Sequence, residues 1–353
     1  MGMKKSISFS KISQLLLAVA VVTALLPAIP AHAASAADGN CQSVRLPVAL
    51  NAGQAANQTV SGNLCTPLTW ASGPHQVDVL TPGGTYNSLY WDWPQDPALY
   101  SYADKTLQAG RATFTYDRLG TGASSHPLST SLTINTEAYV LHQVVTWAHD
   151  QGFGQANLFG HSYGSMITAQ EAGTYNDANR VVITGMTHIP RIGVGLIGTA
   201  GSLYPAALDS EFLGKGLDLG YLTTEPNTRA QAFYSSSADP SVIAYDEAHK
   251  DVAPASGVAT IATTYAIPAP LNTSDQITAP VLLVDGQEDA AFCLLPSALY
   301  CASGNALRTS ELPYYAAAAS VTGAVVPGTG HDLTLHPSAN ESFNVINQWI
   351  KTH

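Results

Sequence analysis

The sequence predicts an α/β fold, in which helices cover both faces of a mostly parallel sheet and a helical insertion extends from it. Three observations predict this class. Short apolar runs alternate with helical patterns from about Val77 onward, which is the order that crossover helices between parallel strands produce. The runs are apolar at successive positions, which is typical of strands buried on both faces. The chain has 353 residues, of which 46% are hydrophobic and 11% charged, and this is enough to bury a large core in one domain.

Six runs have the length and composition of buried strands. In chain order they span residues 76–82, 111–117, 155–160, 180–186, 280–286 and 323–328. Between the second run and the third, the apolar residues of Glu137–Gly152 recur every three or four positions. This segment is therefore predicted to be an amphipathic helix that packs on the sheet.

One long segment, from Ile189 to Thr278, breaks the alternation. It is rich in glycine, proline and aromatic residues and contains two helical patterns, at 226–237 and 240–252, but no convincing strand. Insertions of this length usually carry function rather than extend a sheet. We therefore predict a helical lid at about 189–278, over the carboxyl ends of the strands.

The first 33 residues have the composition of a secretory signal peptide. Lys4, Lys5 and Lys11 precede an uncharged run from Leu15 to Leu26, and a small-x-small cleavage site follows at 31–33. The apolar run has about 12 residues, whereas a membrane span needs roughly 20, and no later run reaches that length. We therefore predict a cleaved signal peptide at 1–33, an exported mature domain at 34–353 and no membrane span in the mature chain.

The mature chain is predicted to be strongly acidic. Three of the 14 Lys and Arg residues and none of the 25 Asp and Glu residues lie in 1–33, so the remainder has a formal charge of −14. This balance argues against nucleic acid or an anionic membrane as a partner.

The four cysteines are even in number, which in an exported chain favours two disulfides. Three pairings are possible, and we expect the local one, Cys41 with Cys65 and Cys293 with Cys301. No pair has the C-x-x-C spacing of a zinc site, so we expect no metal.

The run from Ala156 to Ile167 contains the pattern G-x-S-x-G, with Ser162 between Gly160 and Gly164. The pattern alone is weak evidence, because a chain with 29 glycines matches it easily by chance. Here an apolar strand leads into it and a helical pattern follows, which is the arrangement of a nucleophile elbow. We therefore expect Ser162 to be a catalytic nucleophile.

A serine nucleophile needs a histidine base and a carboxylate that orients it, and in this type of fold the acid precedes the histidine. Asp289 lies in the loop after a buried strand and is the expected acid, with Glu288 and Asp285 as alternatives. His331 follows the last predicted strand and is the expected base, with His336 as its competitor.

An oxyanion intermediate needs two N–H donors at fixed positions. The first is expected from the backbone of Tyr163, next to the nucleophile. The second is expected from the loop after the first predicted strand, at Gly84, with Thr85 as the alternative.

From about Val77 to the C-terminus, the sequence resembles the α/β-hydrolase superfamily, and in particular secreted serine esterases and lipases. The resemblance lies in the serine motif, in the loop "PGGTYNSLYWD" and in "YDRLGTGASSHP". It implies hydrolysis of carboxylic esters or lactones through an acyl-enzyme, without a cofactor. It also implies that Asp117–Ser124 is a turn that shapes the site. Pro82-Gly83 stands where the superfamily usually has His-Gly, a departure that keeps the backbone donor.

Aromatic residues around these motifs favour a hydrophobic substrate. We expect Tyr86, Trp91 and His161 to contact it. Amidase, carbon–carbon hydrolase and perhydrolase chemistry use the same triad, and the fold also occurs in binding proteins without catalysis, so these functions remain alternatives.

Overall fold

The computed structural model describes residues 1–2, 39–188, 202–265, 267–293 and 300–353. Contacts divide the chain into Met1–Ala33 and Ala34–His353, and every helix and strand of the described ranges belongs to the second unit. The predicted signal peptide falls almost entirely outside the described residues and stays a prediction. Within the described ranges, no helix is long and apolar enough to cross a membrane.

An eight-stranded sheet runs through the second unit, in the order β1-β2-β4-β3-β5-β6-β10-β11. Its strands are β1 (Gly39–Val48), β2 (Gln58–Pro67), β3 (Gln76–Thr81), β4 (Ala112–Asp117), β5 (Gln155–His161), β6 (Arg180–Thr184), β10 (Val281–Gly286) and β11 (Val321–Val326). Within this sheet, the six neighbouring strands β4, β3, β5, β6, β10 and β11 all pair in parallel. All six predicted strands are present, so the predicted mostly parallel sheet is confirmed.

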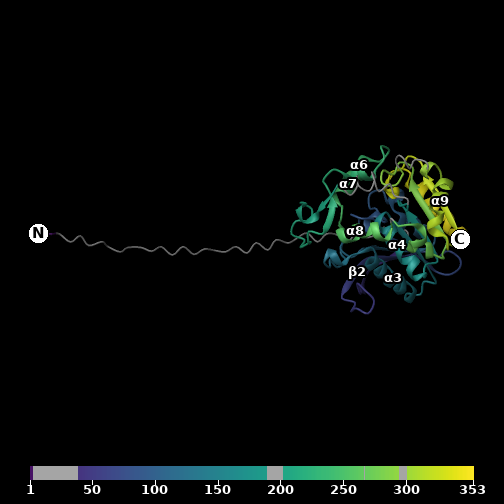
Figure 1. Cartoon of the computed structure of the whole chain (residues 1–353), viewed down its shortest axis with the longest axis horizontal. Helices are drawn as coiled ribbons and strands as arrows, with labels where there is room; N and C mark the ends of the chain where they lie inside the picture. The colour runs from purple at the N-terminus through teal and green to yellow at the C-terminus, as the bar shows by residue number, and fades with distance from the viewer. Residues whose placement is uncertain (3–38, 189–201, 266, 294–299) are drawn as a thin grey trace. The chain divides into compact units, whose positions relative to one another are not determined.

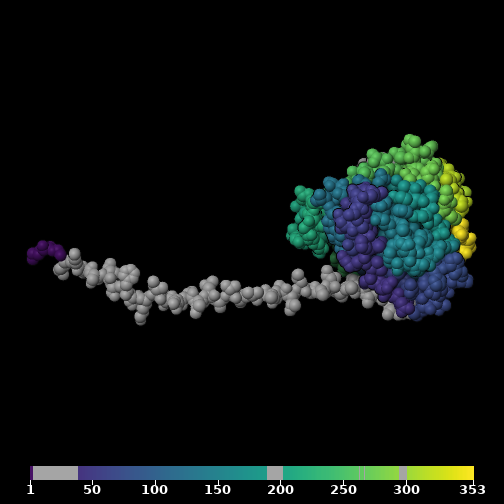
Figure 2. Space-filling model, turned by 90° about the horizontal axis from the view of Figure 1, so that it is seen from below, coloured from purple at the N-terminus to yellow at the C-terminus, as the bar shows by residue number. Residues whose placement is uncertain are grey.

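The hairpin β1–β2 was not predicted. It pairs antiparallel with β4 and extends the sheet at one edge, and in Figure 2 this purple-blue segment forms a strip on the surface. Its register places Cys41 directly opposite Cys65, with Cα atoms 4.0 Å apart, and the two are bridged. The second bridge joins Cys293 to Cys301, so the predicted pairing is confirmed.

Helices cover the sheet on both faces. The helices outside the insertion are α1 (Pro97–Tyr100), α2 (Tyr102–Gln108), α3 (Ile134–Asp150), α4 (Tyr163–Tyr175), α9 (Gly304–Glu311) and α10 (Ala339–Thr352). Side chains from α3, α4 and α9 form one apolar core, and those from α2 and α10 form the other. Neighbouring strand residues divide between the cores: Leu158 lies in the first and Phe159 in the second. This alternation explains why the strands are apolar at successive positions.

The described part of the insertion contains both helices and strands. Its elements are β7 (Leu203–Pro205), β8 (Tyr221–Thr224), α6 (Arg229–Phe233), α7 (Pro240–Ala248), β9 (Ala253–Pro254) and α8 (Ala255–Thr264). The expectation of no strand was wrong, because β7, β8 and β9 form a small antiparallel sheet. Strands of two to four residues are too short to show a periodic pattern. Figure 1 shows α6 and α7 on the side of the unit opposite α3.

Candidate active site

Ser162 occupies a strained turn between β5 and α4. Its backbone has φ 52° and ψ −118°, a conformation that non-glycine residues rarely adopt and that clusters at functional sites. A Cβ added to Gly160 would lie 2.4 Å from the Cα of Ser165, and one on Gly164 would lie 2.5 Å from the carbonyl oxygen of Pro82. Both positions therefore require glycine, and the turn has the geometry of a nucleophile elbow.

Asp289 and His331 are joined by a hydrogen bond of 2.8 Å between Oδ2 and Nδ1. Burial alone would raise the pKa of Asp289, but the charge and hydrogen bond of His331 and the N–H groups of Ala291 and Phe292 outweigh it and hold that pKa below its usual value. Burial would lower the pKa of His331, but Asp289 outweighs burial and raises it. With the proton held on Nδ1, Nε2 of His331 is left free to accept a proton.

His331 lies beside the residue that precedes Ser162. The rings of His161 and His331 are 4.8 Å apart, and a Cβ on Gly185 would approach both of them, at 2.8 and 3.2 Å. Among the described residues, the hydroxyl of Ser162 makes no hydrogen bond. The structure therefore brings Asp289 and His331 together near the turn that carries Ser162.

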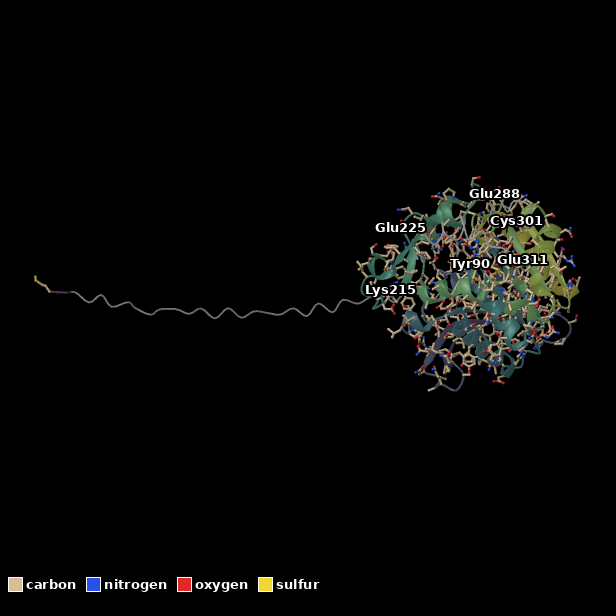
Figure 3. All side chains as sticks on the ribbon, in the orientation of Figure 1. Tyr90, Lys215, Glu225, Glu288, Cys301 and Glu311 are labelled. Atoms are coloured by element: carbon tan, nitrogen blue, oxygen red, sulfur yellow. A yellow bond between two sulfur atoms is a disulfide. The ribbon has the colours of Figure 1, made fainter. Side chains whose placement is uncertain are left out.

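The two alternative acids have other surroundings. Asp285 is buried, where its Oδ1 accepts a hydrogen bond of 3.0 Å from the N–H of Met186 and its pKa is raised by burial. Glu288 is exposed at the rim of the unit (Figure 3). Of the three carboxylates, the hydrogen bond to His331 is made by Asp289.

The competing base, His336, has both ring nitrogens occupied by the backbone. Its Nε2 accepts hydrogen bonds from the N–H groups of Ser235 and Gly330, at 3.0 and 3.1 Å, and its Nδ1 donates to the carbonyl of Asp332. It therefore holds the loop of His331 against the insertion and has no free nitrogen for catalysis.

Arg118 holds the loop after β3. It lies in the turn predicted at Asp117–Ser124, but no role of its own was predicted for it from the sequence. Its guanidinium donates to the carbonyl oxygens of Pro82 at 3.2 Å and Gly83 at 3.1 Å. It also pairs with Glu137 at 2.8 Å, and the other oxygen of Glu137 accepts a hydrogen bond from the hydroxyl of Tyr163. One buried cation thus fixes the loop to the first turn of α4.

The hydrogen bond from Arg118 to the carbonyl of Gly83 determines where the N–H of Gly84 points. In a trans peptide the C=O and N–H point in opposite directions, so the N–H of Gly84 faces away from the guanidinium that binds the carbonyl of Gly83. A Cβ on Gly83 would lie 3.4 Å from the Cβ of Ser162. Neither Gly84 nor Tyr163 donates its N–H to another described residue, so both donors are available at the serine. This orientation favours Gly84 over Thr85.

A buried charged network connects the insertion to this site. Arg229 of α6 pairs with both oxygens of Asp246 of α7, at 2.7 and 2.9 Å, and lies 4.2 Å from the ring of Tyr86. The hydroxyl of Tyr86 bonds to Asp246 at 3.0 Å and also to Asp332. Asp332 in turn contacts Nε2 of His161 at 3.2 Å. Sequence patterns did not predict this network, because its members lie far apart in the chain.

The three residues expected to contact substrate are buried and make contacts within the protein. Tyr86 and His161 are buried, and their polar atoms are bound within the network. Trp91 is also buried, and its ring packs against Tyr102 and Phe159 at 5.6 and 6.2 Å. Buried aromatic residues are often part of a core, and contact of these three residues with a substrate stays a prediction.

A second Ser–His–carboxylate chain lies elsewhere in the fold. The hydroxyl of Ser274 lies 2.9 Å from Nε2 of His188, and Nδ1 of His188 lies 2.7 Å from Oε2 of Glu311. All three residues are buried, and His188 is stacked between the rings of Tyr265 and Tyr314. This chain joins the end of β6 to the turn before β10 and to α9, and it offers no access to a substrate.

Three groups of residues in the described ranges have the composition to hold a metal ion. They are His161, His331 and Asp332; Asp285, Cys293 and Cys301; and His142, Glu171 and Asp177. The first belongs to the site of Ser162, and the cysteines of the second are bridged. The third lies away from both, where α3 meets the end of α4.

A serine on a strained strand–helix turn, a histidine–aspartate pair and free N–H donors on this sheet define the class of α/β hydrolases. Residues 79–340 match the Alpha/beta hydrolase family. This is more than half of the chain, and the chain belongs to this family. No curated protein matches it.

Three solved structures illustrate the similarity of the fold. They are a thermophilic esterase from Thermogutta terrifontis (17% identity, TM-score 0.55, 88% of this chain and 98% of that one), a Paleococcus ferrophilus monoacylglycerol lipase (15%, 0.52, 81% and 96%) and a Mycobacterium smegmatis proline iminopeptidase (18%, 0.53, 88% and 98%). At these identities the similarity shows the fold, and the substrate has to be argued from the site.

Proposed function

We propose that this chain is an exported serine hydrolase that cleaves carboxylic esters or lactones with apolar acyl groups. The observation that carries the proposal is Ser162 at positive φ between two obligatory glycines, beside the bonded pair of His331 and Asp289. A carboxylate with a lowered pKa and a histidine with a raised pKa support a pair tuned for proton transfer.

The reaction follows from these positions. The Oγ of Ser162 attacks the acyl carbon while Nε2 of His331 takes its proton, and Asp289 stabilises the imidazolium that forms. The negative oxygen of the tetrahedral intermediate accepts hydrogen bonds from the N–H groups of Gly84 and Tyr163. His331 then gives its proton to the departing alkoxide, and a water activated in the same way releases the acid.

The surroundings of the base support an apolar substrate. The rings of Phe233 and Phe292 lie 5.6 and 5.8 Å from the ring of His331. Both side chains are buried, and Phe233 belongs to the predicted lid. Two apolar rings beside the base favour an acyl group or lactone ring without charge.

Export is proposed from the N-terminal sequence and the cysteines. Two bridged pairs and no free cysteine among the described residues fit an oxidising compartment. Expression with the leader intact is expected to release a protein that begins near Ala34, as N-terminal sequencing can measure. Retention of Met1 on the released protein would contradict the predicted cleavage.

A fluorophosphonate probe tests the catalytic proposal. The wild-type protein is expected to be labelled and Ser162→Ala is expected not to be. Ser274→Ala serves as the matched control, because Ser274 belongs to the second, buried group of hydrogen-bonded serine, histidine and carboxylate side chains. Labelling that survives Ser162→Ala would overturn the assignment. No labelling of a folded wild-type protein would favour a binding function.

A substrate panel then separates the remaining chemistries. p-Nitrophenyl esters of increasing chain length, lactones and anilides are compared by kcat/KM. The proposal expects esters or lactones to be hydrolysed faster than the matched anilides. Faster hydrolysis of the anilides would identify an amidase instead.

A further inference from the structure

His142, Glu171 and Asp177 form a cluster at the end of α4 that is remote from Ser162. His142 lies on α3, Glu171 lies in the last turns of α4, and Asp177 lies just after that helix. The nine residues from Ser162 to Glu171 span roughly 14 Å along the helix. Nδ1 of His142 lies 2.7 Å from Oδ2 of Asp177 and 3.6 Å from Oε1 of Glu171.

Three of the four carboxylate oxygens in this cluster lack a donor. Both oxygens of Glu171 and Oδ1 of Asp177 are buried without a hydrogen-bond partner, and the side chain of Glu171 is 0% exposed. Buried polar atoms are nearly always hydrogen-bonded, and an unpaired buried carboxylate is costly. Burial raises the pKa of Glu171 to about 8. Among the described residues, His142 is the one basic side chain that pairs with either carboxylate. The cluster therefore has two carboxylates and a single basic group.

We propose that His142, Glu171 and Asp177 bind a divalent transition-metal ion, with zinc as the preferred ion. One imidazole nitrogen and two carboxylates form a ligand set that zinc accepts, whereas calcium and magnesium prefer oxygen alone. Zinc bonds of about 2.0–2.1 Å place tetrahedral ligand atoms roughly 3.3 Å apart. The two distances from Nδ1, 2.7 and 3.6 Å, lie on either side of that value, and the three ligand atoms all lie within 4.8 Å of one another, so shifts on the order of half an ångström would bring them to the spacing of zinc ligands.

The cluster also has a route to solvent and a fixed ligand. The side chains of His142 and Asp177 are 29% and 24% exposed, while Glu171 closes the inner side. The ring of His142 is stacked on that of Tyr175, with centroids 3.8 Å apart, which orients its Nδ1 toward the carboxylates. Water fills the fourth position of the metal. The ion would tie α3 to the end of α4, so its effect is on stability rather than on the reaction.

Metal binding requires that a proton leaves. In the metal-free cluster, Nδ1–H of His142 donates to Oδ2 of Asp177 at 2.7 Å. When the ion binds, the imidazole proton moves to Nε2 or to solvent and any proton on Glu171 is released, because metal ligands must be deprotonated. Zinc binding is therefore expected to release protons.

The test uses the full chain after treatment with a chelator and dialysis, and Zn²⁺ alone as the probe. Titration calorimetry is expected to give one tight equivalent of zinc, a proton release seen by comparing two buffers, and weaker binding of Ca²⁺ and Mg²⁺. A hundredfold excess of zinc over Kd is expected to raise Tm by roughly 5 °C. Glu171→Gln and His142→Gln should each lose the tight equivalent and the rise in Tm.

Two controls make the result specific. Asp150→Asn removes an exposed carboxylate near the end of the same α3 and should keep the tight equivalent. His331→Gln should keep it too, because it disables the other histidine-containing group. The proposal is overturned if wild type binds no zinc at micromolar concentration, if Glu171→Gln and His142→Gln both retain the equivalent, if His331→Gln loses it, or if calcium binds more tightly than zinc.

Discussion

Replacing Arg118 by lysine is expected to lower kcat about a hundredfold in a protein that still folds. Arg118 is buried and does not react, but its guanidinium binds the carbonyl oxygens of Pro82 and Gly83 while it pairs with Glu137. Lysine keeps the charge but has a single nitrogen. It cannot reach all three acceptors in the arrangement that the planar guanidinium holds. The peptide that carries the N–H of Gly84 is then free to rotate.

The magnitude follows from the bonds that are lost. A hydrogen bond from a charged donor contributes about 1.5–3 kcal/mol, so the bond from Arg118 to the carbonyl of Gly83, which shares a peptide with the N–H of Gly84, accounts for roughly that much preference for the observed orientation. The effect on rate is limited by complete loss of one oxyanion donor, about 10²- to 10³-fold. Because the charge beside Glu137 survives, the free energy of unfolding should fall by less than the about 3–5 kcal/mol of a broken buried pair.

The assay measures kcat on a p-nitrophenyl ester and the free energy of unfolding in urea for the same samples. Arg111→Lys is the matched control, because Arg111 precedes β4 where Arg118 follows it, and it is also buried and paired, at 2.8 Å from Asp78. Arg111→Lys should lower stability and leave kcat unchanged. Wild-type kcat in folded Arg118→Lys, or an equal loss of kcat in Arg111→Lys, would refute the role of the guanidinium in orienting the loop.

Two further predictions concern the acid and its loop. His331 acts as a base only when it is neutral, and its pKa is raised above 6.5 because Asp289 outweighs the effect of burial. Activity should therefore rise with pH through a midpoint above 6.5. Asp289→Asn should move that midpoint to lower pH and lower kcat by up to about 10⁴-fold. The backbone N–H of Cys293 donates to the carbonyl oxygen of Asp289 at 2.8 Å, and Cys293 is bridged to Cys301. The bridge therefore helps to hold the loop of the acid, and replacing both cysteines by serine should lower kcat as well as Tm.

Each of these predictions has a neighbouring control. Glu288→Gln removes an exposed carboxylate next to the acid, and the pH profile of kcat/KM should not change; a midpoint at or below pH 6.5 in the wild type would contradict the balance of burial and charge at His331. Serine at Cys41 and Cys65 removes the bridge of the edge hairpin, which should lower Tm alone. An equal kcat for both bridge variants would show that the second bridge does not position the acid.

Local patterns predicted the parts of the fold that local physics determines. Strands buried on both faces must be apolar at successive positions, so β3 to β6, β10 and β11 were visible in the sequence. The elbow at Ser162 was visible because close approach of backbone atoms requires glycine at 160 and 164. The disulfide pairing was predicted because both bridges close short loops.

The interactions between distant segments were not predictable in the same way. Arg118 contacts a loop 35 residues earlier, and Tyr86 bonds to an aspartate 160 residues later. No periodic pattern records such pairings, and a buried arginine looks like any other arginine in a single sequence. The same limit applies to Trp91, since a single sequence does not distinguish an aromatic side chain of the core from one that lines a binding site.

The two Ser–His–carboxylate groups differ in the features that are expected of a nucleophile. Ser274 already has the hydrogen bond to histidine that Ser162 lacks. However, Ser274 is 1% exposed, and its hydroxyl also lies 2.8 Å from the carbonyl oxygen of Tyr314. Ser162 is half-buried rather than enclosed, sits at positive φ and has two free backbone N–H donors beside it. The proposed role of Ser162 therefore depends on an accessible hydroxyl on a strained turn, with N–H donors placed for an oxyanion, rather than on a preformed hydrogen bond to histidine.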